Sequence, residues 1–404
     1  MTKSLKSFGP GLLFAGAAIG VSHLVQSTRA GADFGFGLLW ALLLVHLFKY
    51  PFFQYGPRYA TATGKSLLDG YLKLGKGVLI AYFILNIATM FTIQAAVTIV
   101  TAGLAINLFG LTSDPVIWSI VITIIGMIIL IKGRYKLLDN LMKIIIIILT
   151  ITTIISVIVA LLNTNNSYSL IQIIPKETKE ISFLIAFLGW MPGPLDMSIW
   201  HSLWAIEKKK DSKVFNTKKS IFDFNIGYIG TLFLGFCFLL LGVLVMNNTG
   251  ENFSGSAGKF TNQLLTLYTK NIGDSMYIFI AIAAFTTMFS TTLTTLDASP
   301  RAMTKTIELL TNKVDKKIYW FWIVFLAIGT LVILKFFLSE MVTLVRIATI
   351  LSFLTAPFYA IINFVLISGK HTPKKWHPSI GMKILSYLGI IFLIGFSGWY
   401  LMNL

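Results

Sequence analysis

The chain alternates between long apolar runs and short polar connections along its whole length. Runs such as IIIIILTITTIISVIVALL (144–162) and GTLFLGFCFLLLGVLVM (230–246) exceed the apolar stretch of a soluble core helix. About 20 apolar residues cross a bilayer, so the pattern predicts an all-α integral membrane protein. We predict eleven spans, at about 9–32, 35–57, 78–110, 115–132, 139–162, 181–206, 221–246, 276–297, 318–338, 343–367 and 380–402.

The polar connections carry their positive charge mainly on one side. With the N-terminus placed in the cytoplasm, the cytoplasmic connections hold 23 Lys and Arg residues and the opposite ones hold 5. Cytoplasmic loops are enriched in Lys and Arg, so we predict a cytoplasmic N-terminus and an extracytoplasmic C-terminus. The bias also accounts for the net charge of +17. A basic chain can bind nucleic acid, but we expect no nucleic-acid partner here.

Two of the predicted spans are interrupted at membrane depth. The first span has Gly20 to His23 at its midpoint, and the sixth contains GWMPGPLDMSIWHS (189–202), with two prolines and Asp196. Proline removes a helix hydrogen bond, and a carboxylate is costly in hydrocarbon. The spans stand five apart and run in opposite directions, so they predict an inverted-repeat transporter with its site between two unwound turns, near 19–23 and 191–196. A kink that serves packing alone is the alternative.

Composition agrees with the membrane prediction. The chain is 56% hydrophobic and 12% charged, whereas soluble domains carry about 25% charged residues. The single Cys237 excludes an internal disulfide and a cysteine-based metal cluster. The start, MTKSLKSFGPGLLFAGAAIG, has features of a signal peptide, but the apolar pattern continues beyond it and we expect it to remain as the first span.

Six short stretches carry a family resemblance. They are GPGLLFAGAAIG (9–20), RAGADFGFGLLWALLL (29–44), TGKSLLDGY (63–71), RYKLLDNLMKI (134–144), WHS (200–202) and ILSFLTAPF (350–358). In this order they resemble the landmarks of the Nramp family of divalent-metal/proton symporters, which have the LeuT-type fold. The resemblance implies one transporter domain over 1–404, with five-span repeats at about 9–162 and 181–367 and an extra helix at about 380–402.

The functional motifs depart from the family pattern. The first-span motif is Asp-Pro-Gly-Asn, whose Asp and Asn bind metal, and the matching residues here are Gly20, Val21, Ser22 and His23. The sixth-span motif is Met-Pro-His. Aligned on His201-Ser202, it falls on Pro194, Leu195 and Asp196, while Met191-Pro192 lies about one turn earlier. The acidic proton-route residues of the third span fall on Gln94 and Val97, and the glutamine of the tenth falls near Thr355.

The resemblance and the interrupted spans together select the candidate site residues. Imidazole suits transition metals and a carboxylate suits most cations, so the candidate metal ligands are His23, Met191 and Asp196. The candidates for the substrate or metal site are Gly20, His23, Met191, Pro194, Asp196 and Thr355, and those for a proton or coupling-ion route are Gln94, His201, Thr287, Ser290 and Thr291.

Each candidate also has a plainer interpretation. The histidines could be structural hydrogen-bonding residues, and the hydroxyls of the eighth span could bond back to their own helix. In the first and sixth spans, the basic residues at the depth of Asp196 are the weak bases His23 and His201. We therefore expect a bound cation to neutralise the Asp196 carboxylate.

The resemblance implies a secondary transporter of the plasma (inner) membrane that moves a cation, first of all a divalent metal, by alternating access. No permanently bound cofactor is expected, and coupling to H+ or Na+ is left open. Its partners would be the cation and the lipid bilayer, and we expect a monomer. The alternatives are a LeuT-type carrier of an organic solute and a transport-dead receptor with the same fold. An enzyme is not expected, because the sequence has no nucleophile–base motif and no His-x-x-x-His pair.

Overall fold

The structure is a computed structural model that describes residues 9–132, 135–163, 168–211, 215–247, 253–272, 277–337 and 340–403. The ends of the predicted domain, 1–8 and 404, lie outside the described residues, as do 276 and 338, which are predicted span ends. Within the described ranges every regular element is a helix. The all-α prediction is therefore confirmed.

The helices follow the predicted spans in order. They are α1 (Pro10–Ala18), a π-helical segment (Ser22–Ser27), α2 (Thr28–Phe34), α3 (Leu39–Thr63), α4 (Leu67–Leu74), α5 (Lys76–Phe109), α6 (Pro115–Lys132), α7 (Tyr135–Leu162), α8 (Thr178–Trp190), α9 (Met197–Asp211), α10 (Thr217–Val245), α11 (Ala257–Ile272), α12 (Tyr277–Thr311), α13 (Lys316–Val332), a second π-helical segment (Ile333–Phe337), α14 (Met341–Ser368), a 3-10 turn (Lys374–Trp376) and α15 (Ile380–Met402).

The sequence pattern fails mainly at the ends of helices. The eighth span was predicted to end at residue 297, but α12 continues to Thr311. Its last turns carry charged residues that line a large pocket, so the hydropathy that marks a span is lost before the helix ends. The connections also contain the short helices α4 and α11.

Within the described residues, six helices are long and apolar enough to cross a membrane, or seven when the bent pair at the start of the chain is taken as one span. Two shorter apolar helices lie within α6 and α7. These findings establish a multi-pass membrane protein. The number of eleven spans remains a prediction.

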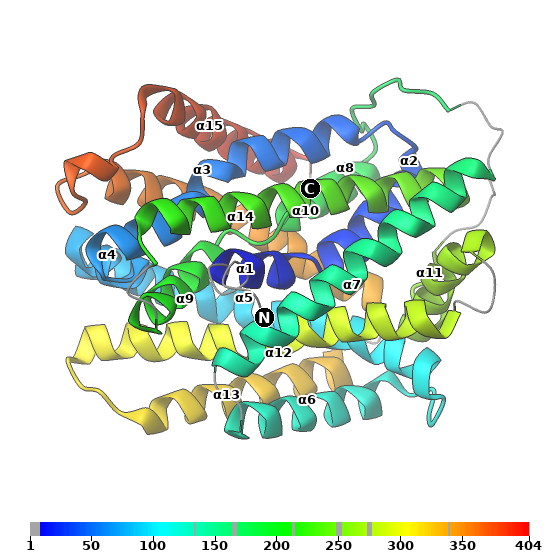
Figure 1. Cartoon of the computed structure of the whole chain (residues 1–404), viewed down its shortest axis with the longest axis horizontal. Coiled ribbons are helices and arrows are strands. Elements are labelled where there is room, and N and C mark those ends of the chain that lie inside the picture. The colour runs from blue at the N-terminus through cyan, green and yellow to red at the C-terminus, as the bar shows by residue number, and fades with distance from the viewer. Residues whose placement is uncertain are drawn as a thin grey trace.

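The two interrupted spans lie inside the bundle and have matching neighbours. Figure 1 shows α1 near the middle, with α6 and α13 along one edge and α15 along the opposite edge. In the first span, α1 packs against α10 and α7, while in the sixth, α9 packs against α3 and α8 packs against α14. The first span thus packs against the seventh and the fifth, and the sixth packs against the second and the tenth. These are equivalent contacts when the first five spans are superposed on the second five, as expected for an inverted repeat.

The first span is anchored on α10 at very short range. A side chain on Gly11 would place its Cβ 2.1 Å from the carbonyl oxygen of Asp223, so only glycine allows this approach. The Asp223 carboxylate accepts hydrogen bonds from the backbone N–H groups of Gly9 and Gly11, at 3.2 and 2.7 Å. It thereby satisfies donors that the start of a helix leaves free and fixes the depth of the first break.

Candidate functional site

The first break lies between Ala18 and Ser22, where the two parts of the span meet at an angle of 47°. It is shorter than predicted, because Ser22 and His23 already belong to the π-helical segment. The Ser22 hydroxyl lies 2.6 Å from the carbonyl oxygen of Ala18 and 3.3 Å from that of Pro192. Through Pro192 the first break therefore contacts the second.

The second break separates α8, which ends at Trp190, from α9, which begins at Met197. Pro192 has no N–H group to satisfy the carbonyl of Leu188, four residues earlier. The ammonium of Lys49, on α3, takes that role: its Nζ donates to the carbonyl oxygens of Leu188 and Gly189, both at 2.7 Å, and of Gly193, at 3.3 Å. A positive charge is also favourable at the C-terminal end of a helix.

Asp196 immediately precedes α9 and is 3% exposed. Its carboxylate lies beside the N–H groups of Asp196 itself and Met197, but neither oxygen accepts a hydrogen bond of ordinary geometry from any residue that the structure describes. The positive end of the α9 dipole favours an anion at this position. Asp196 interacts electrostatically with Lys49, Tyr71, Tyr82 and Tyr359. Lys49 is a correction to the sequence analysis, which considered basic residues of the first and sixth spans only.

Three phenols from different helices form one cluster beside Asp196. Tyr71 of α4 and Tyr82 of α5 have ring centroids 6.1 Å apart, and Tyr82 and Tyr359 of α14 are 6.3 Å apart. The Tyr71 hydroxyl donates to Asn363 at 2.7 Å. Within the described part of the chain, the buried hydroxyls of Tyr82 and Tyr359 have no hydrogen-bond partner. This phenol cluster supplies oxygen atoms that a bound cation or water could use.

A small cavity of about 20 Å³ lies where the two breaks face α5 and α12. Its wall includes Ser22, Gly193 and Pro194 from the breaks and the apolar side chains of Ile93 and Trp190. Such a volume holds about one water molecule. The space between the two breaks therefore has room for about one water molecule or a small ion in this conformation.

The three candidate metal ligands, His23, Met191 and Asp196, each contact different groups. His23 is fully buried, with Nε2 3.0 Å from the Thr231 carbonyl oxygen and Nδ1 2.7 Å from the Ser22 hydroxyl, so both ring nitrogens are engaged. The sulfur of Met191 accepts from the Ser27 hydroxyl at 3.9 Å. Among the described residues, no group of three or more His, Cys, Asp or Glu side chains could hold a metal ion.

The other substrate-site candidates have mainly backbone roles. A Cβ on Gly20 would lie 2.9 Å from the Thr291 hydroxyl, so Gly20 lets the first break approach α12. The Pro194 carbonyl accepts from the N–H of Met197 at 3.1 Å and helps to begin α9. Thr355 donates to carbonyls of its own helix at 3.1 and 3.2 Å.

Gln94 and His201 differ in their surroundings. Gln94 joins α5 to α12, because its Oε1 accepts from the Thr295 hydroxyl at 2.6 Å and its Nε2 donates to the Thr292 carbonyl at 3.3 Å. His201 stacks on Phe14, with ring centroids 5.5 Å apart, and neither of its ring nitrogens has a hydrogen-bond partner among the described residues. In this conformation His201 therefore lies among aromatic rings and not along a chain of polar groups.

The hydroxyls of the eighth span mostly bond within α12. Thr287 donates to Ala283 at 2.7 Å, and Ser290 donates to Thr287 at 2.7 Å. Thr291 lies 3.2 Å from the Thr287 carbonyl and also 3.3 Å from the Gly16 carbonyl of α1. Hydrogen bonding within the helix thus accounts for most of these contacts. Thr291 also links α12 to the first span.

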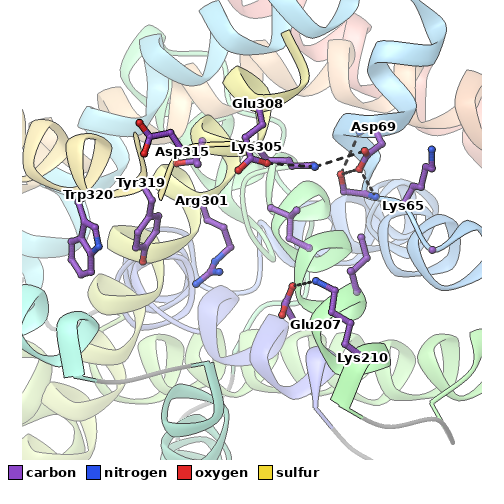
Figure 2. Close-up of a pocket in the computed structure, with 15 residues that line it drawn as sticks. Lys65, Asp69, Glu207, Lys210, Arg301, Lys305, Glu308, Asp315, Tyr319 and Trp320 are labelled. Atoms are coloured by element: carbon purple, nitrogen blue, oxygen red, sulfur yellow. Dashed lines mark hydrogen bonds and ion pairs between the residues drawn. The ribbon is translucent and has the colours of Figure 1, made fainter. Parts of the chain in front are cut away.

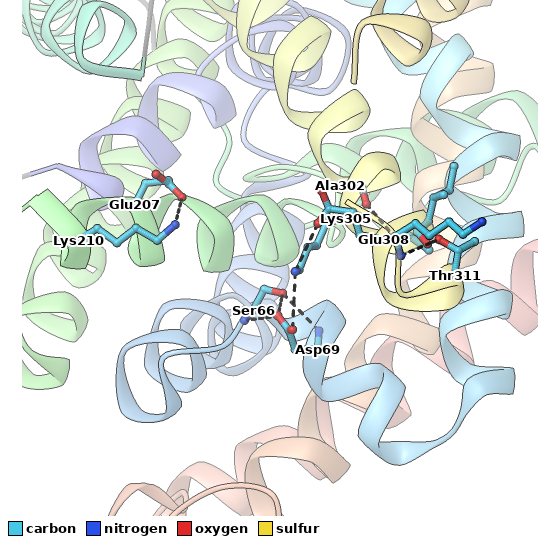
Figure 3. Close-up of polar contacts among 11 residues, drawn as sticks. Ser66, Asp69, Glu207, Lys210, Ala302, Lys305, Glu308 and Thr311 are labelled. Atoms are coloured by element: carbon cyan, nitrogen blue, oxygen red, sulfur yellow. Dashed lines mark hydrogen bonds and ion pairs between the residues drawn. The ribbon is translucent and has the colours of Figure 1, made fainter. Parts of the chain in front are cut away.

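A vestibule of about 690 Å³ opens where the ends of α3, α9 and α12 meet α4 and α13 (Figure 2). Lys305 lies between two carboxylates, 3.9 Å from Asp69 and 3.6 Å from Glu308 (Figure 3). Glu207 and Lys210 of α9 form a pair at 2.8 Å. The predicted topology places this charged end of the bundle in the cytoplasm. The helices α4 and α9 carry both vestibule residues and members of the buried site.

Neither Lys49 nor the phenol cluster was predicted as part of the transport site. The signal for Lys49 was its position as a charged side chain inside the apolar run LLLVHLFKYPFF (42–53). An ionisable residue at membrane depth is a functional candidate with a partner to be identified. The phenols had no comparable signal, because tyrosines are common in membrane spans.

The fold is shared with solved transporters of low sequence identity. A mutant of the Eremococcus coleocola manganese transporter matches with a TM-score of 0.76 at 13% identity, over 98% of this chain and 86% of that one. Mhp1, a nucleobase-cation-symport-1 family transporter with bromovinylhydantoin bound, matches at 0.63 and 12%, over 97% and 92%. MhsT in complex with L-phenylalanine matches at 0.63 and 14%, over 100% and 98%. These likenesses confirm the LeuT-type fold.

Sequence comparison establishes the family. An uncharacterized protein of Pasteurella multocida (strain Pm70) is 34% identical over 403 residues, which cover 97% of this chain and 93% of that protein. The family described as natural resistance-associated macrophage protein-like, Nramp, matches residues 11–403. Members of this family are transporters and not enzymes. The interrupted helices, the fold and the match over nearly the whole length together show that the chain belongs to the Nramp family.

Proposed function

We propose that this protein is a secondary transporter that moves a cation, with a divalent metal as the expected cargo, across the plasma membrane by alternating access. The observation that carries the proposal is Asp196, a buried carboxylate at the break of the sixth span, whose oxygens accept no hydrogen bond of ordinary geometry from the described residues. Family membership and the likeness to a manganese transporter support it. A cation that binds Asp196 would neutralise a charge that is costly at membrane depth.

The residues around Asp196 suggest how the cargo is held and released. The phenol cluster offers neutral oxygens, and the vestibule offers an exit along α4 and α9. The contact of Ser22 with the Pro192 carbonyl joins the two breaks. We infer that this contact and the shape of the small cavity between the breaks change as the site opens to one side of the membrane and then to the other.

A carrier of an organic solute is the second candidate. Two observations favour it: Trp190 and Trp200 line the central cavity, and the described residues lack a cluster of three metal-ligating side chains. The solved transporters Mhp1 and MhsT, which share the fold, hold organic ligands in their structures. Under this alternative, Asp196 would bind an amino or other cationic group of the solute.

Uptake by purified protein in liposomes separates the two candidates. We expect uptake of at least one of Mn²⁺, Mg²⁺ and Ca²⁺ above that of protein-free liposomes, saturable and inhibited by the other divalent ions. Amino acids and nucleobases should not be taken up. Accumulation of an organic solute without transport of any divalent cation would contradict the metal proposal and favour the alternative.

The proposed orientation places the N-terminus in the cytoplasm and the C-terminus outside. Part of its basis, Lys3, Lys6, Arg134 and Lys213, lies outside the described residues. Ser169 and Lys375 are both exposed, and the proposed orientation places Ser169 outside the cell and Lys375 in the cytoplasm. We expect a membrane-impermeant thiol reagent to label a Ser169→Cys variant in intact cells but a Lys375→Cys variant only after permeabilisation. The wild type is the control, since its single Cys237 is buried. Labelling of Lys375→Cys in intact cells would refute the orientation or the span count.

A further inference from the structure

The Lys49 side chain is fully buried in the middle of α3, and its charge has an unusual set of partners. Its three nearest acceptors are the backbone carbonyls of Leu188, Gly189 and Gly193. Among the described residues, no carboxylate lies within the 4.0 Å that defines an ion pair with Lys49. The ammonium is therefore held by backbone carbonyl oxygens and by the more distant charge of Asp196.

The same carbonyls have the properties of a site for a small monovalent cation. Unwound carbonyls and the C-terminal ends of half-helices coordinate Na⁺ or H⁺ in transporters with broken helices, and rings of backbone carbonyls replace the hydration shell of K⁺ in channels. Here the break and Pro192 free these oxygens, and the three N–H donors of an ammonium match three acceptors in number.

We propose that the Lys49 ammonium is a tethered cation that occupies this carbonyl site in place of a free monovalent cation such as Na⁺ or K⁺. The inference goes beyond the proposed function, because it concerns a fixed charge and holds whichever solute is carried. Its consequence is that the native protein needs no free cation at the end of α8. A lysine that merely closes the helix end would instead leave no ion-selective site when it is removed.

Two substitutions distinguish a tethered cation from a purely structural lysine. Lys49→Ala removes the ammonium and leaves space beside the three carbonyls, so a free cation or methylammonium can enter with water as further ligand. Lys49→Met, the matched control, also removes the charge and the donors but fills the space with an apolar chain. Both variants should unfold at lower temperature than the wild type, because both leave buried carbonyls without donors.

The measurement is the thermal unfolding of the purified full chain in detergent, titrated with Na⁺, K⁺ or methylammonium at constant ionic strength, with choline as the balancing ion. We expect at least one of the three ions to raise the melting temperature of Lys49→Ala saturably, by about 5 °C. The wild type and Lys49→Met should show no ion-specific shift. If no ion stabilises Lys49→Ala relative to choline, or if the wild type responds as strongly, the proposal is wrong.

A low yield of Lys49→Ala would not prevent the test. Its amount after extraction from membranes in Na⁺, K⁺, methylammonium or choline is then compared with that of Lys49→Met: selective recovery of Lys49→Ala with any of the first three ions supports a cation site, and no recovery with any of them contradicts it. Neither measurement involves transport. Failure here therefore leaves the proposed transport function intact, and failure of the uptake experiment leaves the Lys49 site intact.

Discussion

Replacement of Asp196 by asparagine is expected to reduce cation uptake at least about tenfold. A tenfold loss corresponds to about 1.4 kcal/mol of binding free energy, and removing the carboxylate charge from a buried cation site should exceed that. Asparagine has nearly the same shape, and among the described residues neither carboxylate oxygen accepts a hydrogen bond of ordinary geometry that the change would remove. Expression in the membrane and thermal stability should therefore be preserved while uptake is lost.

Glu207→Gln is the matched control for this variant. Glu207 lies on the same helix, α9, and the substitution makes the same change of charge, but its side chain is 43% exposed and forms an ion pair with neighbouring Lys210. Exposed ion pairs contribute little, so uptake should stay within about twofold of the wild type. Normal uptake by Asp196→Asn in the same liposome assay would exclude the carboxylate as a cargo ligand and would favour backbone carbonyls and the phenol cluster.

The interruptions of the first and sixth spans were predictable because their causes are local. Proline lacks the N–H that continues a helix, so Pro192 and Pro194 mark the second break from sequence alone. The first break has no proline and is correspondingly shorter, with helical backbone resuming at Ser22 in π-helical form. For the same reason His23 lies in a helix and not in an unwound turn, which the sequence pattern did not reveal.

The partners of the site residues were not predictable, because they come from spans far apart in the chain. The ring of His23 is oriented by the Thr231 carbonyl of α10, 208 residues away, and the carbonyls of α8 are satisfied by Lys49 of α3. Apolar periodicity shows that these helices exist but not which faces meet. Knowledge of the fold identifies which spans are neighbours, but the direction of each side chain depends on depth and rotation about the helix axis.

The depth and rotation of α8 depend on one glycine, which leads to a second prediction with a large effect. A Cβ on Gly189 would lie 2.1 Å from the carbonyl oxygen of Thr349 on α14, a distance that no real contact reaches. Gly189→Ala should therefore force α8 and α14 apart. Overpacking costs typically 1–3 kcal/mol and occasionally more. Because backbone meets backbone here, we expect a loss of about 3 kcal/mol in stability.

The same displacement should also affect the site. The carbonyls of Leu188 and Gly189 both bind Lys49, so moving α8 away from α14 alters the end of the helix on which that contact depends. We expect Gly189→Ala to unfold at lower temperature in detergent and to lose most of its uptake in liposomes.

The control is Gly395→Ala on α15, where an added Cβ meets no described atom within 4 Å. There alanine should leave stability unchanged or raise it by about 0.5–1 kcal/mol, because glycine is the weaker helix former. Equal stability of the two variants would show that α8 does not pack on α14 in this register, and the contact of Lys49 with the carbonyls of α8 would then have to be reassigned.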